Sequence, residues 1–121
     1  QQRRLAAAKT PEARTAVLVG VALALEPQDP VEAAYAWFDV LMEAPGHEQA
    51  SAAADRLFTL YEEWTTLARV LEIRAEARLA RGDRARALEG LARVAGLAVT
   101  RLDSAELLER TTTRIKQLRG S

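Results

Sequence analysis

The single histidine of the sequence lies beside residue types that could form a catalytic or metal site. His47 follows Pro45-Gly46, Glu48 is its neighbour, and Ser51 comes four residues later, on the same face of a helix. A nucleophile–base pair would need a third group to orient the histidine and donors for an oxyanion, and none is evident. One histidine and one carboxylate also fall short of the ligand set that a metal site usually has. We therefore expect His47 to be a turn residue, and the chain to have no catalytic residue, no metal site and no cofactor.

Arginines are concentrated in the second half of the sequence. Arg74, Arg78 and Arg81 follow one another at i, i+4 and i+7, so that on a helix they form one basic stripe. An acidic partner or a nucleic-acid backbone could bind such a stripe, but no aromatic residues alternate with it to stack on bases. Because nearby carboxylates partly offset the charge, a solvated helix face explains the pattern better than nucleic-acid binding.

The charges of the whole chain balance. Seventeen Lys and Arg against seventeen Asp and Glu give a formal net charge of zero, which argues against a globally basic nucleic-acid binder and a long acidic tail. The absence of cysteine excludes disulfides and thiolate metal sites. Richness in Ala and Arg indicates a GC-rich bacterial genome. Because the sequence starts without Met, we interpret it as a segment of a larger protein; no motif identifies a compartment, and we expect the cytoplasm.

One wholly apolar run could be mistaken for a targeting or membrane segment. Residues 16–25 carry no charge and follow a basic start at Arg3, Arg4 and Lys9. A membrane-spanning helix needs about 20 apolar residues, so the run is too short to cross a bilayer. Glu12 lies close before it, which is unlike a signal peptide. We expect a buried first helix.

Proline, glycine and capping residues divide the chain into six predicted helices. Thr10 and Asp29 are predicted N-caps, each followed by Pro, and Glu32 would complete a capping box with Asp29. Pro45-Gly46 and Gly82-Asp83 interrupt the apolar periodicity. The predicted helices cover about 11–25, 30–44, 47–60, 63–80, 84–99 and 103–118. No strand pattern competes with them, so the predicted class is all-α, and the short loops make successive helices antiparallel.

The apolar faces of these helices predict the core. In the second helix one face holds Val31, Ala34, Tyr35, Phe38, Leu41 and Met42. Trp37, Val40 and Ala44 extend the apolar character to another face, as expected of a helix with neighbours on two sides. In the fifth helix the predicted face is Leu88, Leu91, Ala92, Ala95 and Val99. An aromatic seam between the second, third and fourth helices is predicted from Tyr35, Trp37, Phe38, Phe58, Tyr61 and Trp64.

Four residues of this second helix make it similar to the second helix of a tetratricopeptide repeat. Ala33, Trp37, Val40 and Pro45 supply the small, aromatic, apolar and proline positions of that family at its spacings. The small residue lets paired helices touch, and the proline ends the helix. The resemblance implies an α-solenoid of helix-turn-helix pairs, about 11–44, 47–81 and 83–118, in a single domain over residues 1–121.

The resemblance continues less regularly along the chain. Leu67 lies one repeat length after Ala33, with Leu71 at the aromatic position. Ala87, after the Gly82-Asp83 turn, follows Leu67 by only 20 residues, so the register changes there. The sixth helix is polar, with Thr111-Thr112-Thr113, and is expected to cap the array.

The family resemblance also implies a binding surface. In tetratricopeptide arrays, peptides often lie in a groove formed by the first helix of each pair. Carried to the second pair, this groove would be lined by Gln49, Ala52, Arg56 and Thr59, with Arg56 pairing to a carboxylate. An ordinary solvated helix face explains the same four residues.

These observations favour a non-catalytic module for protein–protein interaction or scaffolding, which binds a peptide or helix of a partner in a repeat groove. The alternative is a regulatory or structural appendage of a larger enzyme or transcriptional regulator. A third interpretation is self-association through an uncapped end of the array.

Overall fold

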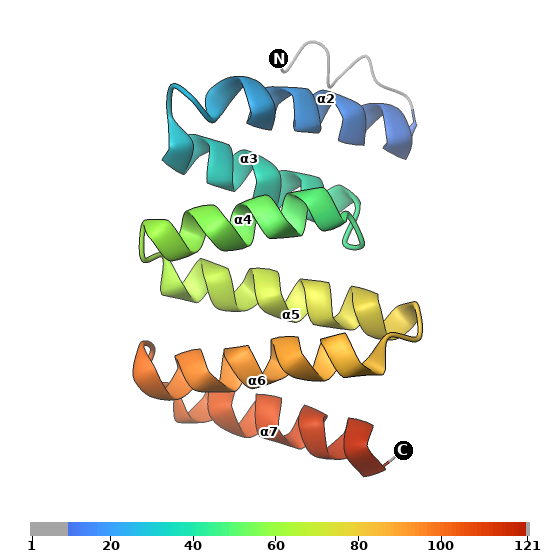
Figure 1. Ribbon diagram of the computed structural model, residues 1–121, viewed down its shortest axis with the longest axis vertical. Helices are drawn as coiled ribbons and strands as arrows, with labels where there is room; N and C mark the ends of the chain where they lie inside the picture. Colours follow the sequence, from blue (N-terminus) through green and yellow to red (C-terminus); the bar gives the residue numbers. More distant parts are fainter. Residues whose placement is uncertain (1–9, 121) are drawn as a thin grey trace. The chain divides into compact units, whose positions relative to one another are not determined.

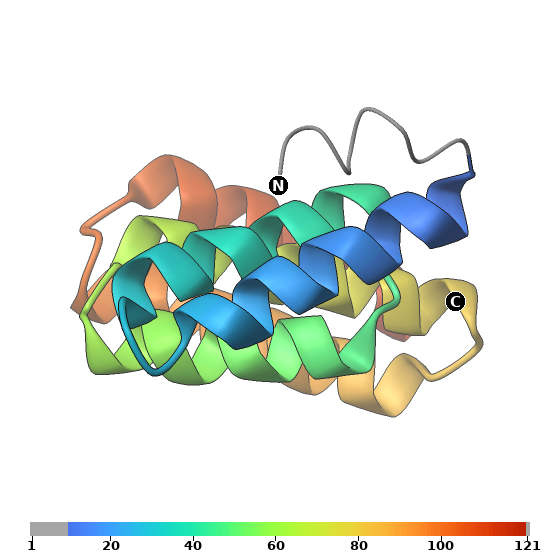
Figure 2. The same cartoon turned by 90° about the horizontal axis from the view of Figure 1, so that it is seen from above.

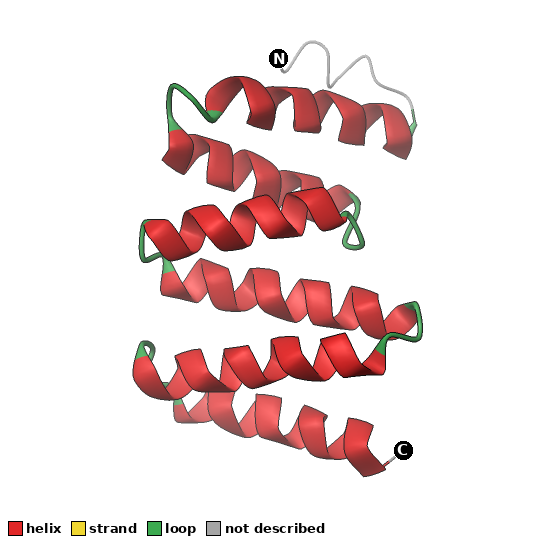
Figure 3. Ribbon diagram, in the orientation of Figure 1, coloured by secondary structure: helices red, strands yellow, loops and turns green. Residues whose placement is uncertain are grey.

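The computed structural model describes residues 10–120, which form six α-helices joined by short turns (Figures 1 and 3). They are α2 (Pro11–Leu25), α3 (Pro30–Glu43), α4 (Glu48–Leu60), α5 (Trp64–Ala80), α6 (Arg84–Thr100) and α7 (Ala105–Gly120). No strand occurs among the described residues. The all-α prediction is confirmed, and every helix end lies within two residues of its predicted position.

Side-chain caps fix where most of these helices begin. The backbone N–H of Ala13 donates to Thr10 Oγ1 at 3.0 Å, and that of Glu32 donates to Asp29 Oδ1 at 3.2 Å. The predicted capping box is only half formed, because the N–H of Asp29 donates to the carbonyl of Leu25 at 2.7 Å and so is not available to Glu32. Asp83 caps α6 in the same way, through the N–H of Arg86.

The chain divides into two compact units, and the boundary lies between Glu62 and Glu63. We call the part with α2, α3 and α4 the first unit and the part with α5, α6 and α7 the second unit. The boundary falls inside the predicted pair 47–81, so each unit holds three successive helices. That these helices form tetratricopeptide-like pairs in a single domain stays a prediction.

In the first unit, α3 packs against both α2 and α4 (Figures 1 and 2). Trp37, Val40 and Leu41 of α3 are almost completely buried, as are Leu57 and Phe58 of α4. Small residues also lie in this core, among them Ala33, Ala34, Ala50 and Ala54. These small side chains let the helices approach closely, so that they pack around the large ring of Trp37.

Two residues predicted on the buried face of α3 lie at the surface instead. Tyr35 is 38% exposed and Met42 is 48% exposed. They are seven residues apart and therefore share one side of the helix, opposite Trp37 and Val40. The Tyr35 ring still meets the edge of Phe58, with centroids 5.1 Å apart and planes at 75°.

The apolar helix α2 is less buried than its sequence predicts. Ala22 is its only fully buried residue, and Leu23 is 51% exposed. Within the first unit α2 packs on α3, so one side of the helix is covered. The expectation of a buried first helix was therefore wrong for most of its side chains. Over residues 10–120, no helix combines the length and apolarity needed to cross a bilayer.

In the second unit, α6 packs against α5 and α7 (Figure 1). Its buried residues are Ala87, Leu91, Val94 and Ala98. The predicted face was displaced by one residue over much of the helix, since Ala92 is exposed and Val99 is 60% exposed. Apolar residues occur on several sides of α6, so periodicity alone did not select the correct one.

The predicted aromatic seam is confirmed only in part. Trp37 and Phe58 are buried, whereas Tyr61 follows the end of α4 and is 41% exposed. Trp64 is half-buried in the second unit, where the guanidinium of Arg101 lies 4.8 Å from its ring centroid.

The turns after α4 and α5 share a left-handed residue. Glu62 has φ 55° and Gly82 has φ 84°. Each follows the helix C-cap and precedes the N-cap of the next helix, a position at which a left-handed residue commonly ends a helix. Glycine adopts this conformation without steric cost, whereas glutamate does not.

Candidate functional site

The four residues that the family resemblance implied are all at the surface of α4. Gln49, Ala52, Arg56 and Thr59 are exposed. Arg56 forms an ion pair with Glu26, and Thr59 Oγ1 donates to Asp55 at 3.3 Å. A carboxylate of a bound peptide would therefore have to compete with Glu26 for the guanidinium, and binding at this surface stays a prediction.

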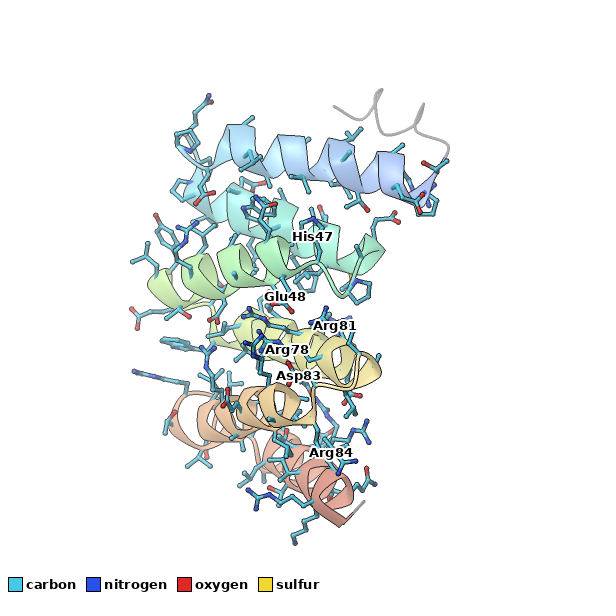
Figure 4. All side chains as sticks on the ribbon, turned by 45° about the vertical axis from the view of Figure 1, so that its right-hand side comes forward. His47, Glu48, Arg78, Arg81, Asp83 and Arg84 are labelled. Atoms are coloured by element: carbon cyan, nitrogen blue, oxygen red, sulfur yellow. The ribbon has the colours of Figure 1, made fainter. Side chains whose placement is uncertain are left out.

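The predicted basic stripe lies along α5 but is not evenly exposed. Arg74 and Arg78 are half-buried, and with Glu89 and Gly90 of α6 they line a hollow of about 120 Å³. Arg81 is exposed and is the C-cap of α5. Figure 4 shows Arg78 and Arg81 next to the turn that leads to Asp83 and Arg84. The stripe therefore faces α6 over part of its length.

His47 and Ser51 are both used in the first turn of α4. His47, labelled in Figure 4, is the N-cap. Its Nδ1 accepts from the N–H of Ala50 at 3.1 Å. Ser51 is buried, and its Oγ donates to the carbonyl of Glu48 at 3.2 Å. Both side chains therefore form hydrogen bonds with the backbone at the amino-terminal end of α4. Among residues 10–120, no three His, Asp or Glu side chains are grouped as a metal ion would require.

A hollow in the second unit lies between α5 and α7. Its volume is about 610 Å³. Glu72 and Glu76 of α5 form one wall, Leu91 of α6 contributes an apolar side chain, and the other wall comes from α7. We call this the larger hollow of the α5–α7 groove.

A second hollow of about 430 Å³ adjoins the first. The two share Glu72, Glu106 and Arg110 as lining residues, so they form one groove along the two helices. The smaller hollow adds apolar side chains at its own end, namely Ala68, Leu102 and Leu107. Each hollow of the groove thus combines charged groups with apolar side chains.

Two ion pairs cross the groove from α7 to α5. Arg110 Nη2 lies 3.2 and 3.0 Å from the two carboxylate oxygens of Glu72. Arg114 donates from Nη2 to Glu76 Oε1 at 2.8 Å and from Nε to Oε2 at 3.0 Å. Both pairs join residues 38 apart in sequence, and the partners are four residues apart on each helix. The pairs therefore form a ladder between two parallel helices, with one rung per helical turn.

The ion pair between Arg114 and Glu76 shifts the pKa of both partners. The hydrogen bond from Arg114 lowers the pKa of Glu76 from its ordinary value, with burial opposing this and the charge of Arg114 assisting it. The pKa of Arg114 is raised for the same reason. Each partner stabilises the charged form of the other.

The larger hollow has more negative than positive charge. Its lining includes four carboxylates, Glu72, Glu76, Glu106 and Glu109, against the guanidinium groups of Arg110 and Arg114. The ladder neutralises the first two carboxylates. None of the described residues forms an ion pair with Glu106 or Glu109, so the hollow keeps two negative charges in excess.

A buried hydroxyl without a partner also lines the larger hollow. Thr111 of α7 is 2% exposed, and its Oγ1 forms no hydrogen bond within the described part of the chain. A threonine on a helix commonly bonds a carbonyl one turn earlier. A buried polar group without a partner is destabilising, and the Oγ1 atom itself is inaccessible to solvent.

This groove was not predicted from the sequence. The polar residues of α7 indicated a solvating cap, and the glutamates of α5 were considered only as charges that offset its arginines. A usable signal was present in Glu106, Arg110 and Arg114, which follow one another at i, i+4 and i+8, facing Glu72 and Glu76 at i and i+4. Only the fold shows that the two sets meet across α6.

Comparison of the chain with models of known protein families, with curated protein sequences and with solved structures gives no significant match.

Proposed function

We propose that this chain is a non-catalytic interaction module, which binds a peptide or helix of a partner protein in the α5–α7 groove. The observation that carries the proposal is the groove itself, with Leu91 and a buried hydroxyl inside and a carboxylate excess at its wall. Ligand sites combine an apolar surface with a few polar groups in this way. The arrangement as tetratricopeptide-like pairs is part of the same proposal.

The dimensions of the groove support a peptide as the ligand. The lining residues of α7 run from Glu106 to Gln117, which is roughly 16 Å at 1.5 Å per helical residue. An extended peptide covers that length with about five residues. Contacts of this size belong to weak, transient interactions.

Site-specific photo-crosslinking tests the proposal. A photoreactive amino acid is placed at Thr113 or Thr65, which are exposed and line the groove, and at Ala85 of α6, which is exposed and does not line it. We expect the two groove positions to crosslink to the same partner in cells that express the parent protein, and Ala85 not to do so.

Two further outcomes of this experiment are informative. A fourth position, Ala52 on α4, tests the surface that the family resemblance implied. Crosslinks from the groove to another segment of the parent polypeptide would support the alternative function, a regulatory appendage. Equal labelling from Ala85 and the groove positions would contradict binding in the groove.

A further inference from the structure

We infer that a second copy of this chain packs on the outer face of α2, with the two α2 helices antiparallel and Gly20 at the two-fold axis. This outer face consists of the exposed, uncharged residues on the side of α2 opposite the buried Ala22, namely Ala13, Ala16, Gly20, Leu23 and Ala24. The inference concerns the first unit and does not depend on the peptide groove proposed in the second unit.

The outer face of α2 is apolar although the described chain leaves it uncovered. No residue from 15 to 25 is charged, and a helix that is apolar on all sides is normally buried on all sides. Here α2 packs on α3, and Leu23 remains 51% exposed. By comparison, the exposed residues of α7 in the second unit include Glu109, Lys116 and Arg119, as expected of a solvated helix. An exposed apolar face of the α2 kind marks a contact with another protein surface.

Gly20 favours a close helix–helix contact on this face. Within a helix glycine is less favourable than alanine, because glycine has more conformational freedom to lose on folding. A Cβ added at Gly20 would meet no neighbouring atom within 4 Å, so packing within the chain does not require a glycine here. Because glycine has no side chain, the backbone of a second helix can approach closely at this position.

The order of residues on the outer face identifies a second copy as the occupant. Ala16 and Ala24 lie four residues on either side of Gly20, and the half-buried Val17 and exposed Leu23 lie three residues on either side. In an antiparallel pair centred on Gly20, Ala16 of each copy therefore lies at the level of Ala24 of the other. Val17 is matched with Leu23 in the same way. At 3.6 residues per turn the two members of a matched pair lie on opposite sides of the line through Gly20, so their side chains interdigitate. A two-fold interface requires such self-complementarity.

The charges beside the outer face favour the antiparallel orientation. Arg14 and Glu26 lie six residues on either side of Gly20, so antiparallel helices bring the Arg14 end of each copy to the Glu26 end of the other. A parallel pair would instead place like charges at the same level, which is unfavourable. Within each chain Arg14 pairs with Glu43 and Glu26 pairs with Arg56, and the antiparallel contact leaves both ion pairs in place.

Sedimentation equilibrium of the 121-residue chain tests the inference. The outer face is roughly 17 Å long at 1.5 Å per residue, and a single helix pair buries less than the roughly 1,200 Å² of a stable complex. We therefore expect a weak dimer, and concentrations from about 10 µM to 1 mM cover the affinities of such small interfaces. The average mass should rise from monomer towards dimer over this range. A monomer at every concentration overturns the inference.

Matched variants locate the contact. Leu23→Glu should weaken dimerisation at least tenfold, because it places a charge in the centre of the interface. Met42→Glu is the control, since Met42 of α3 is an apolar residue of similar exposure, 48% against 51%, and it should change the dissociation constant less than twofold. Gly20→Leu should also weaken dimerisation at least tenfold, yet it should not lower the melting temperature of the monomer, because space is open around Gly20 and leucine favours the helix. Equal effects of Leu23→Glu and Met42→Glu, or an unchanged dimer in Gly20→Leu, overturn the assignment.

Cysteine crosslinking tests the orientation, since the chain has no cysteine of its own. Gly20→Cys should form an intermolecular disulfide on mild oxidation, and so should a mixture of Ala16→Cys and Ala24→Cys. Ala16→Cys alone should not, because in an antiparallel pair its two copies are separated by eight residues, roughly 12 Å, whereas a disulfide spans at most about 7 Å between Cα atoms. Crosslinking of Ala16→Cys alone as readily as in the mixture would mean parallel helices and overturn the antiparallel arrangement.

A crosslinker in the parent protein distinguishes a second copy from any other occupant. With a photoreactive amino acid at Leu23, we expect a crosslinked dimer of the parent polypeptide. A crosslink to another segment of the same polypeptide, or to a different protein, would show that a second copy does not occupy this face and would overturn the inference.

Discussion

Arg114 of α7 and Glu76 of α5 form a two-point ion pair, with Nη2–Oε1 and Nε–Oε2 distances of 2.8 and 3.0 Å. A guanidinium and a carboxylate match in this geometry because both are planar and each offers two parallel sites. The pair is half exposed, so we expect it to contribute modestly to stability. Its value for an experiment lies in its dependence on pH.

The first prediction concerns the loss of stability at acidic pH. The hydrogen bond from Arg114 lowers the folded-state pKa of Glu76, so the stabilisation is complete above the pKa of glutamate in the unfolded chain, about 4.3. It is lost as the pH falls through the lower, folded-state pKa. Melting curves of wild type and Glu76→Gln between pH 7 and pH 2 should differ by at most a few degrees at neutral pH and converge in acid.

Glu106→Gln is the matched control for this prediction, because Glu106 lines the same hollow without an ion-pair partner among the described residues. It removes a carboxylate from the same hollow without breaking an ion pair, so at pH 7 it should lower the melting temperature less than Glu76→Gln does. A Glu76→Gln curve parallel to wild type over the whole pH range would show that the ion pair does not stabilise the fold in solution.

The second prediction concerns the core of the first unit. Trp37 is 1% exposed, so Trp37→Ala should destabilise by about 3–5 kcal/mol, from lost burial and the cavity left behind. Trp37→Phe should cost less. The indole Nε1 is buried without a hydrogen-bond partner in the described chain, and phenylalanine removes this polar group. Urea denaturation of both variants measures the difference; a loss in Trp37→Phe as large as that in Trp37→Ala would contradict this expectation.

The third prediction compares two equivalent turns. Gly82 has φ 84° with open space around an added Cβ, so Gly82→Ala should destabilise by about 1 kcal/mol through backbone strain alone. Glu62 has φ 55° in the corresponding turn, and Glu62→Gly should relieve strain there and leave stability equal or higher. Gly82→Ala should therefore lower the melting temperature, whereas Glu62→Gly should leave it unchanged or raise it. A loss on Glu62→Gly as large as that on Gly82→Ala would refute this view of the turns.

The fourth prediction concerns the start of α4. His47 Nδ1 accepts from the N–H of Ala50, and a carboxylate at an N-cap accepts the same bond while favouring the positive end of the helix dipole. His47→Asp should stabilise by about 0.5–1 kcal/mol and His47→Ala should destabilise by a similar amount. Equilibrium unfolding at pH 7 gives both values. If the two variants were equally stable, His47 would not be acting as a cap.

Helix boundaries were predictable because local chemistry sets them. Thr10 and Asp29 cap the helices that they were expected to cap, and each prediction needed only a few neighbouring residues. The buried faces were less predictable. In alanine-rich helices apolar residues lie on several sides, so Tyr35, Met42 and Val99 were placed in the core although they are exposed.

The groove could not be found from the sequence for a different reason. Each of its walls is an ordinary charged helix face when considered alone, and only the packing of α6 between α5 and α7 brings the two together. Thr111 shows the same limit. A threonine in the polar run Thr111-Thr112-Thr113 indicated solvent exposure, but its side chain is turned into the unit and buried.

The equal sequence separation of the two ion pairs has a mechanical consequence. Because both ion pairs join residues 38 apart, sliding α7 by one turn toward the carboxyl end of α5, about 5.4 Å, would bring Arg110 opposite Glu76 and leave Arg114 and Glu72 each without a partner. Such a slip replaces two ion pairs with one, and a smaller shift preserves neither of the original pairs. The two ion pairs together therefore favour one register of α7 along α5 and disfavour the registers displaced from it by one turn or less.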